Sequence, residues 1–328
     1  MTETPPADET PTPDDPSPNE GKAAAYDFNG DGYSDILFQN AKTGELEFWQ
    51  MNGSEVVDVI AFPSMGPKWR TEGAGDFDSD GTTDILVYDD ASRTARVWLM
   101  GDYAGSGEFD VQLRAGWVVA GAGDFNGDGQ SEIAISNQRT RIEIWGLKHE
   151  LVRLARISTR RSWEIAGFGD IDGDGDDDFI FQDRRKRKVE ALLMSADFSA
   201  QRVRVGGLED ALWDIIDSGD FNGDGQSDLL WRKLSWGDAG DAGVLHLLGN
   251  LKLSGEPLDL NLEAGHAVVG SADYDGDGAA DLLIFDPETR ELELWLMDGA
   301  GAHRIESLGT LTADWLPAGF NTDDAAIQ

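Results

Sequence analysis

A short acidic loop recurs six times along this chain, and the repeat limits the possible folds more than any other feature. The copies, loops 1 to 6, are DFNGDGYSDILF from Asp27, DFDSDGTTDILV from Asp76, DFNGDGQSEIAI from Asp124, DIDGDGDDDFIF from Asp170, DFNGDGQSDLLW from Asp220 and DYDGDGAADLLI from Asp273. They start 49, 48, 46, 50 and 53 residues apart. Self-similarity at a period of about 40–50 residues is typical of propeller blades. The spacing therefore predicts one repeat architecture.

Each loop carries oxygen-bearing side chains at its first, third, fifth and ninth positions and a glycine at its sixth, as in Asp27, Asn29, Asp31, Gly32 and Asp35. Hard cations such as Ca²⁺ take six to eight oxygen ligands, and the EF-hand loop spaces its ligands at 1, 3, 5, 7 and 9 around a glycine at 6. The seventh residue of that loop donates its backbone carbonyl, so its side chain is free to vary. The pattern favours calcium, at about six ions per chain.

The candidate ligands share these five loop positions. They are Asp27, Asn29, Asp31, Tyr33 and Asp35; Asp76, Asp78, Asp80, Thr82 and Asp84; Asp124, Asn126, Asp128, Gln130 and Glu132; Asp170, Asp172, Asp174, Asp176 and Asp178; Asp220, Asn222, Asp224, Gln226 and Asp228; and Asp273, Asp275, Asp277, Ala279 and Asp281.

Plain turns, magnesium sites and zinc sites fit the loops less well than calcium sites do. Asp, Asn and Gly also favour turns without a metal, but turns need no fixed ligand register in six copies. Magnesium prefers few protein ligands and keeps its waters. Zinc favours Cys and His, and the chain has no Cys and no His near the loops.

The loops resemble the FG-GAP/VCBS repeats of integrin α-subunit propellers and of many bacterial surface and secreted proteins. The resemblance covers about residues 22–321. It implies that each loop joins the first two strands of a blade and binds calcium there. Glu132 departs from the pattern, because the other five loops have Asp at the ninth position.

The segments between the loops read as short strands, four per repeat, which predicts an all-β propeller. Six complete units run from loop to fourth strand, and the segment WLPAGFNTDD from Trp315 aligns with WEIAGFGDID from Trp163. We therefore expect six blades closed by the C-terminal strand, with a seven-bladed propeller as the alternative. Nine tryptophans recur at fixed places in the strands, which indicates packing between blades.

The chain divides into two parts. Residues 1–21 hold six of the 11 prolines and no large apolar residue beyond Met1, so we expect a disordered Pro/Asp/Glu-rich linker. They lack the basic start and apolar run of a secretory signal. Residues 22–328 are expected to form the propeller. No apolar stretch of the sequence is long enough to span a membrane.

The charge and the motifs of the sequence argue against some classes of function. A net charge of −37 argues against a nucleic acid partner, because its phosphates would be repelled. No catalytic motif is present, which predicts that the chain is not an enzyme. Calcium loops of moderate affinity are occupied by calcium only where its concentration is millimolar, as it is outside cells. We therefore expect a secreted or cell-surface protein.

The sequence thus predicts a calcium-stabilised binding or adhesion propeller that recognises a glycan or a protein. The alternatives are a propeller lectin with repeated sugar sites and an accessory domain of a secreted enzyme. An insertion at residues 232–243 and a basic turn at residues 184–188 are candidate partner surfaces. Their candidate ligand residues are Trp231, Trp236, Arg184, Arg185 and Arg187.

Overall fold

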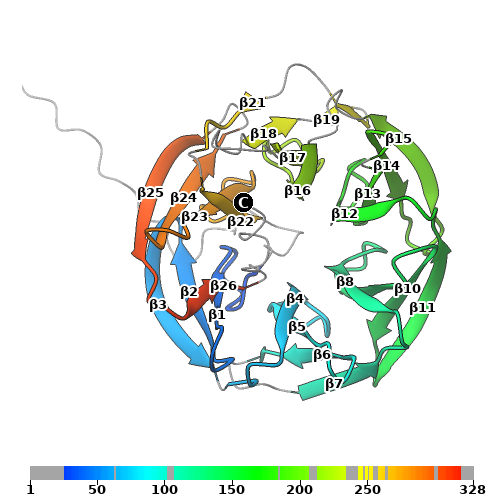
Figure 1. Ribbon diagram of the computed structural model, residues 1–328, viewed down its shortest axis with the longest axis horizontal. Helices are drawn as coiled ribbons and strands as arrows, with labels where there is room; N and C mark the ends of the chain where they lie inside the picture. Colours follow the sequence, from blue (N-terminus) through cyan, green and yellow to red (C-terminus); the bar gives the residue numbers. More distant parts are fainter. Residues whose placement is uncertain are drawn as a thin grey trace, which may run out of the picture.

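The computed structural model describes residues 26–62, 64–101, 107–183, 185–206, 213–233, 243–246, 248–249, 251–253, 258–262, 265–298 and 302–318. Its regular elements are 26 strands. Nowhere in these ranges is there a helix long and apolar enough to cross a membrane. Figure 1 shows the strands arranged as sheets around a central axis. The predicted all-β propeller is confirmed.

Five four-stranded sheets follow one another along the chain, and all their strand pairs are antiparallel. They consist of β4 (Arg70–Gly75), β5 (Asp84–Asp89), β6 (Thr94–Leu99) and β7 (Gly107–Gln112); β8 (Val118–Gly123), β9 (Glu132–Ser136), β10 (Arg141–Leu147) and β11 (Leu151–Ser158); β12 (Glu164–Gly169), β13 (Asp178–Asp183), β14 (Lys188–Leu193) and β15 (Gln201–Gly206); β16 (Trp213–Gly219), β17 (Asp228–Lys233), β18 (Gly243–His246) and β21 (Leu258–Asp259); and β22 (Ala267–Ala272), β23 (Asp281–Phe285), β24 (Glu291–Met297) and β25 (Ala302–Thr310). A two-stranded sheet of β19 (Leu248–Gly249) and β20 (Lys252–Leu253) lies between β18 and β21 in the chain.

The remaining four-stranded sheet is built from both ends of the described chain. Its strands are β26 (Trp315–Pro317), β1 (Ile36–Asn40), β2 (Leu46–Asn52) and β3 (Glu55–Phe62), in that order. β26 pairs antiparallel with β1, with Phe38 opposite Pro317 and Asn40 opposite Trp315. The chain thus supplies five blades whole, and the sixth four-stranded sheet is composite. The seven-bladed alternative is wrong for the described part of the chain.

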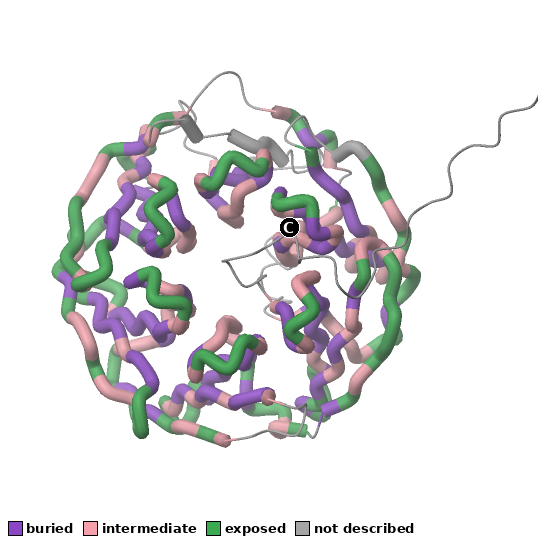
Figure 2. Tube along the Cα trace, turned by 180° about the vertical axis from the view of Figure 1, so that it is seen from behind, coloured by how far each residue is buried: buried purple, intermediate pink, exposed green. Residues whose placement is uncertain are grey.

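The middle strands of each sheet form the core. All residues of β5 and β9 are buried, because both faces of these strands pack against neighbouring sheets. One hydrophobic cluster joins Leu86 and Val97 of one sheet to Ile133 and Ile135 of the next. This explains why the second strands of the repeats read as continuous apolar runs rather than as alternating ones. Figure 2 shows this buried layer inside a rim that is largely exposed or half-buried.

The recurring tryptophans belong to this packing, as predicted. Trp69, Trp163 and Trp295 are buried within clusters that join neighbouring sheets. The half-buried Trp117 and Trp145 pack against the cluster between β4–β7 and β8–β11. These indoles therefore support the contacts between blades.

Candidate metal centres

The six acidic loops share one backbone conformation. The sixth residue is a glycine with positive φ in every loop, for example 87° at Gly81 and 94° at Gly175. L-residues with a Cβ are strained in this region of φ, which accounts for glycine at this position. The fourth residue also has positive φ, and loop 2 places Ser79 there at 62°. In five loops the segment joins the first strand of a sheet to the second; loop 1 leads into β1.

The first carboxylate of each loop holds the turn together. In loop 2, Oδ1 of Asp76 accepts hydrogen bonds from the backbone N–H groups of Ser79 (2.6 Å) and Asp80 (3.2 Å). Its Oδ2 accepts the N–H of Gly81 at 2.9 Å. Bonds to the sixth residue recur in the other five loops. The first carboxylate therefore gathers loop N–H groups around itself before any cation is considered.

The ninth carboxylate is buried and ties the loop to the sheet. In loop 2, Oδ2 of Asp84 accepts the N–H of Phe77 at 2.9 Å, and Oδ1 accepts the N–H of Met100 at 2.8 Å. The same pair of bonds forms in loops 1, 4 and 6. Loop 3 differs, because Oε1 of Glu132 accepts a bond from the amide of Asn126 at 3.0 Å. The ninth residue is thus a structural tie as well as a candidate ligand.

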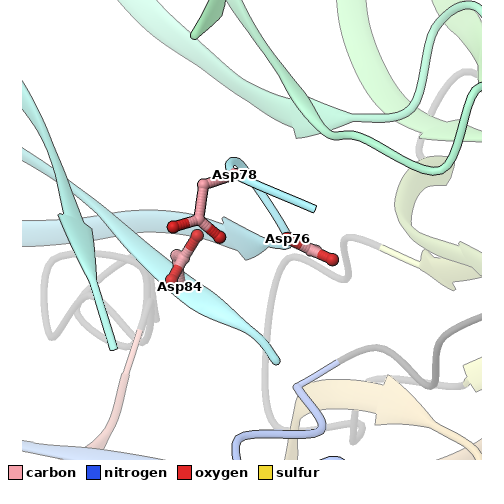
Figure 3. A group of neighbouring side chains, drawn as sticks. All are labelled: Asp76, Asp78 and Asp84. Atoms are coloured by element: carbon pink, nitrogen blue, oxygen red, sulfur yellow. The ribbon is translucent and has the colours of Figure 1, made fainter. Parts of the chain in front are cut away.

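Three loops bring three carboxylates together. The groups are Asp76, Asp78 and Asp84; Asp170, Asp172 and Asp178; and Asp273, Asp275 and Asp281. Within each group the candidate ligand oxygens all lie within 4.8 Å of one another. Figure 3 shows the carboxylates of Asp78 and Asp84 side by side in loop 2. Such a cluster repels itself unless protons or a cation neutralise it.

In two loops the third residue has a buried oxygen atom that lacks a hydrogen-bond partner. Oδ1 of Asp78 and Oδ1 of Asp172 are buried and have no hydrogen-bond partner. Buried carboxylate oxygens without a partner are costly, and each requires an explanation. A cation held between the first, third and ninth residues would pair with these oxygens, so the residues present fit a hard metal ion.

Loops 1, 3 and 5 carry Asn at the third position and lack this three-carboxylate group. The amides of Asn126 and Asn222 donate to the ninth carboxylates Glu132 (3.0 Å) and Asp228 (2.9 Å), and the amide of Asn29 donates to Asp31 at 2.7 Å. A neutral amide replaces one charge and occupies a carboxylate oxygen. The six loops, which the sequence pattern treated as equivalent, therefore fall into two classes.

The fifth carboxylate of each loop is turned toward the seventh residue rather than toward the first, third and ninth. All six Asp side chains at the fifth position accept the backbone N–H of the seventh residue, as in Asp80 and Thr82 at 2.9 Å. None of these fifth-position residues belongs to the three carboxylate groups found among the described residues. A cation would have to draw the fifth carboxylate inward. The seventh side chains Tyr33, Thr82, Gln130, Asp176, Gln226 and Ala279 share no chemistry, which fits a backbone role.

Burial raises the pKa of the ninth carboxyl in five loops; the backbone donors oppose this rise, and neighbouring acids add to it. The pKa values reach about 7 for Asp35 and Asp84, and about 8 for Glu132, Asp178 and Asp281. Without a cation these groups therefore hold protons near neutral pH. A cation that binds there must displace them.

A closed ring of backbone hydrogen bonds links the six loops. The N–H of the eighth residue in each loop donates to the carbonyl of the first residue in the preceding loop. The pairs are Thr83 to Asp27 (2.8 Å), Ser131 to Asp76 (2.7 Å), Asp177 to Asp124 (2.7 Å), Ser227 to Asp170 (2.6 Å), Ala280 to Asp220 (2.7 Å) and Ser34 to Asp273 (3.1 Å). Sequence reasoning missed the eighth residue, because its side chain varies and its contribution is a backbone N–H.

The structure describes only some of the residues predicted to contact a partner. The Trp231 side chain is 1% exposed and packs in the core, so its expected role as a surface anchor is wrong. Its strand β17 lies between β16 and β18 in the sheet, and the neighbouring Leu229 and Leu230 are buried as well. Trp236 and Arg184 lie outside the described residues. Arg185 and Arg187 are exposed, while their neighbour Lys186 pairs with Asp183 at 2.9 Å and so neutralises part of this turn.

Comparison with known families gives a direct match to the loops. A family model described as an FG-GAP-like repeat matches residues 27–87 and 220–284. The first match contains loops 1 and 2, and the second contains loops 5 and 6. No curated protein matches the sequence.

Solved structures support the fold. The chain is similar to part of the Tc holotoxin pore of Photorhabdus luminescens, with a TM-score of 0.56 and 14% identity over 87% of this chain and 14% of that one. It is also similar to a protein from Lactobacillus plantarum, with a TM-score of 0.50 and 11% identity over 84% of this chain and 80% of that one. The chain therefore spans about a seventh of the toxin chain. At these identities the likeness shows the fold alone.

Proposed function

The chain is an all-β propeller that carries FG-GAP-like repeats, and from this premise we propose that it is a calcium-stabilised, non-enzymatic binding propeller. Its partner would be an extracellular glycan or protein. The main support for a metal ion is the pair of buried oxygens on Asp78 and Asp172 that have no hydrogen-bond partner. The repeated rigid scaffold, with loops at one end of every blade, supports the binding role.

The first, third and ninth residues of each loop would hold the ion. These groups are carboxylates or amides, which suit calcium rather than a metal that prefers nitrogen or sulfur. Bound calcium supplies positive charge that neutralises the clustered acids. The chain's own residues do the rest: the first carboxylate orders the turn, and the ninth fastens it to the strand behind.

The composite sheet would be the sixth blade of the ring. The bond from Ser34 in loop 1 to Asp273 in loop 6 joins the first loop to the last. The pairing of β26 with β1 joins the two ends of the described chain within the sheet. These two contacts, one between loops and one between strands, would close the ring and leave no open gap between its first and last blades.

Calcium would contribute substantially to stability. A site with a Kd on the order of 10⁻⁴ M stabilises the fold by about 1.8 kcal/mol at about 2 mM calcium. Six sites of this kind would sum to about 11 kcal/mol, which compares with the total stability of an ordinary domain. Because the acidic unfolded chain also attracts calcium, this sum is an upper bound. Millimolar calcium occurs outside cells, which supports a secreted or surface location.

Calorimetric titration with calcium tests the metal sites. We expect Asp78→Asn to weaken or remove one site, while the matched control Asp58→Asn on the outer strand β3 leaves every site unchanged. Unaltered titrations for both variants would reject loop 2 as a metal site. Glycan-array binding and affinity capture, each with calcium and with EDTA, distinguish a glycan from a protein partner.

A further inference from the structure

A cavity of about 210 Å³ lies between two neighbouring blades, away from the acidic loops. Its apolar walls are Val111 and Leu113 from the end of sheet β4–β7 and Ile135 from sheet β8–β11. Arg114 and Arg153 line it as well, together with the indole of Trp145. The cavity therefore combines an apolar floor with cationic groups.

Three arginines surround one buried acid beside this cavity. The side chain of Glu143 is 0% exposed, and its carboxylate pairs with Arg114 (2.6 Å), Arg156 (2.6 Å) and Arg153 (3.3 Å). Burial raises the pKa of Glu143, but the arginines outweigh burial and leave it lowered. Glu143 is thus ionised, and the cluster keeps two positive charges on a chain whose net charge is −37.

The arginines are held in place without being enclosed. Their side chains remain between 42% and 54% exposed, so their remaining N–H groups can reach a ligand. The guanidinium of Arg114 also stacks on Trp117, 4.4 Å from the ring centre. A fixed guanidinium loses little conformational freedom when it binds a carboxylate, which favours recognition.

Comparison with two other blades shows what is unusual about Trp145. In β2 and β24 the indole N–H donates to the Glu two residues earlier: Trp49 to Glu47 at 2.9 Å, and Trp295 to Glu293 at 2.9 Å. Glu143 holds the equivalent place before Trp145, but the arginines engage it. Nε1 of Trp145 is left buried with no hydrogen-bond partner. In this blade the carboxylate is therefore held by arginines that line the cavity and not by the indole.

We propose that this cavity binds a small cyclic carboxylate, such as a uronic acid or an aromatic acid. Arg114 and Arg153 would take the carboxylate, and the apolar walls and the Trp145 side chain would contact the ring. At about 30 Å³ of liquid per water, the cavity equals roughly seven waters, which suits a single ring. This site extends the proposed binding function and does not depend on the metal.

Titration of the full chain with defined probes, in calcium buffer, tests the site. The cyclic carboxylates are glucuronate and benzoate; glucose tests the ring without charge, and acetate and sulfate test charge without a ring. We expect saturable heat with at least one cyclic carboxylate and a shift of the Trp145 indole ¹⁵N–¹H signal, assigned with Trp145→Phe. Binding of glucuronate alone identifies a saccharide ligand, and binding of benzoate alone an aromatic acid.

Arg153→Gln should weaken that binding about tenfold or more, because it removes a charged hydrogen-bond donor. The matched control Arg204→Gln removes the same charge from an exposed position of β15 and should leave binding unchanged. Arg114→Gln provides a second test if Arg153→Gln lowers the melting temperature. Equal affinity in wild type and both cavity variants, equal binding of acetate and sulfate, or no saturable binding would each overturn the proposal. None of these results bears on calcium binding, which the loop variants test separately.

Discussion

The backbone N–H of Met100 donates a 2.8 Å hydrogen bond to Oδ1 of Asp84, sixteen residues earlier in the chain. The bond joins the ninth residue of loop 2 to the end of β6. Because Asp84 is also one of three clustered carboxylates, one side chain combines a structural tie with a candidate metal ligand. The two roles predict different consequences of mutation.

Asp84→Asn should destabilise the protein even in EDTA. The amide turns an N–H₂ group toward a buried backbone donor, and losing such a bond costs about 1–3 kcal/mol. Asp78→Asn should not lower stability in EDTA, because it removes a charge from a crowded cluster, and should weaken calcium binding instead. Thermal melting of both variants with and without calcium measures the difference. Equal losses in EDTA would contradict separate roles for the third and ninth residues.

Chelation should lower the melting temperature strongly. Without a cation, the carboxylates within 4.8 Å of one another repel, and the bound-ion stabilisation is lost. Added Ca²⁺ should restore the melting temperature, and Mg²⁺ should restore much less of it, because Mg²⁺ keeps its waters. Scanning calorimetry measures this effect. Identical transitions with calcium and with chelator would show that the loops are only turns.

The metal-free protein should lose stability as the pH rises from about 4 to about 8. The ninth carboxyls have a folded-state pKa raised from 3.8 to about 7 in Asp84 and about 8 in Asp178. Across this window the folded state binds more protons than the unfolded state, so the free energy of unfolding falls with rising pH. Saturating calcium should remove this trend, because it displaces those protons. Urea unfolding at several pH values, with and without calcium, measures both slopes.

Calcium titration should resolve two classes of loop. Loops 2, 4 and 6 each gather three carboxylates, while loops 1, 3 and 5 place Asn at the third position. Affinity in calcium loops rises with the number of charged ligands. Asn222→Asp should therefore move loop 5 into the tighter class. Asn261→Asp, which adds the same charge at an exposed turn, is the control. Six indistinguishable sites, unchanged by Asn222→Asp, would contradict this division.

The sequence alone determined the parts of this protein that depend on local order. The interval between loops predicted the propeller, and the glycine at the sixth position predicted the positive φ observed at Gly81. The likeness of the segments at Trp315 and Trp163 predicted that the C-terminal strand would complete a sheet, as β26 does beside β1. These features are readable because each depends on neighbouring residues or on a pattern repeated in every copy.

Only the tertiary structure decided which groups meet across blades. Trp231 was expected at the surface and is buried, because it packs against Val189 and Ala191 of the preceding sheet. The bond from Thr83 to Asp27 uses a backbone N–H, which no residue type reveals. Two of the arginines around Glu143 lie on the neighbouring strand β11, and Arg114 comes from a turn after the preceding sheet, 29 residues from Glu143 in sequence. Contacts of this kind arise only when separate blades pack, so no local pattern in the chain records them.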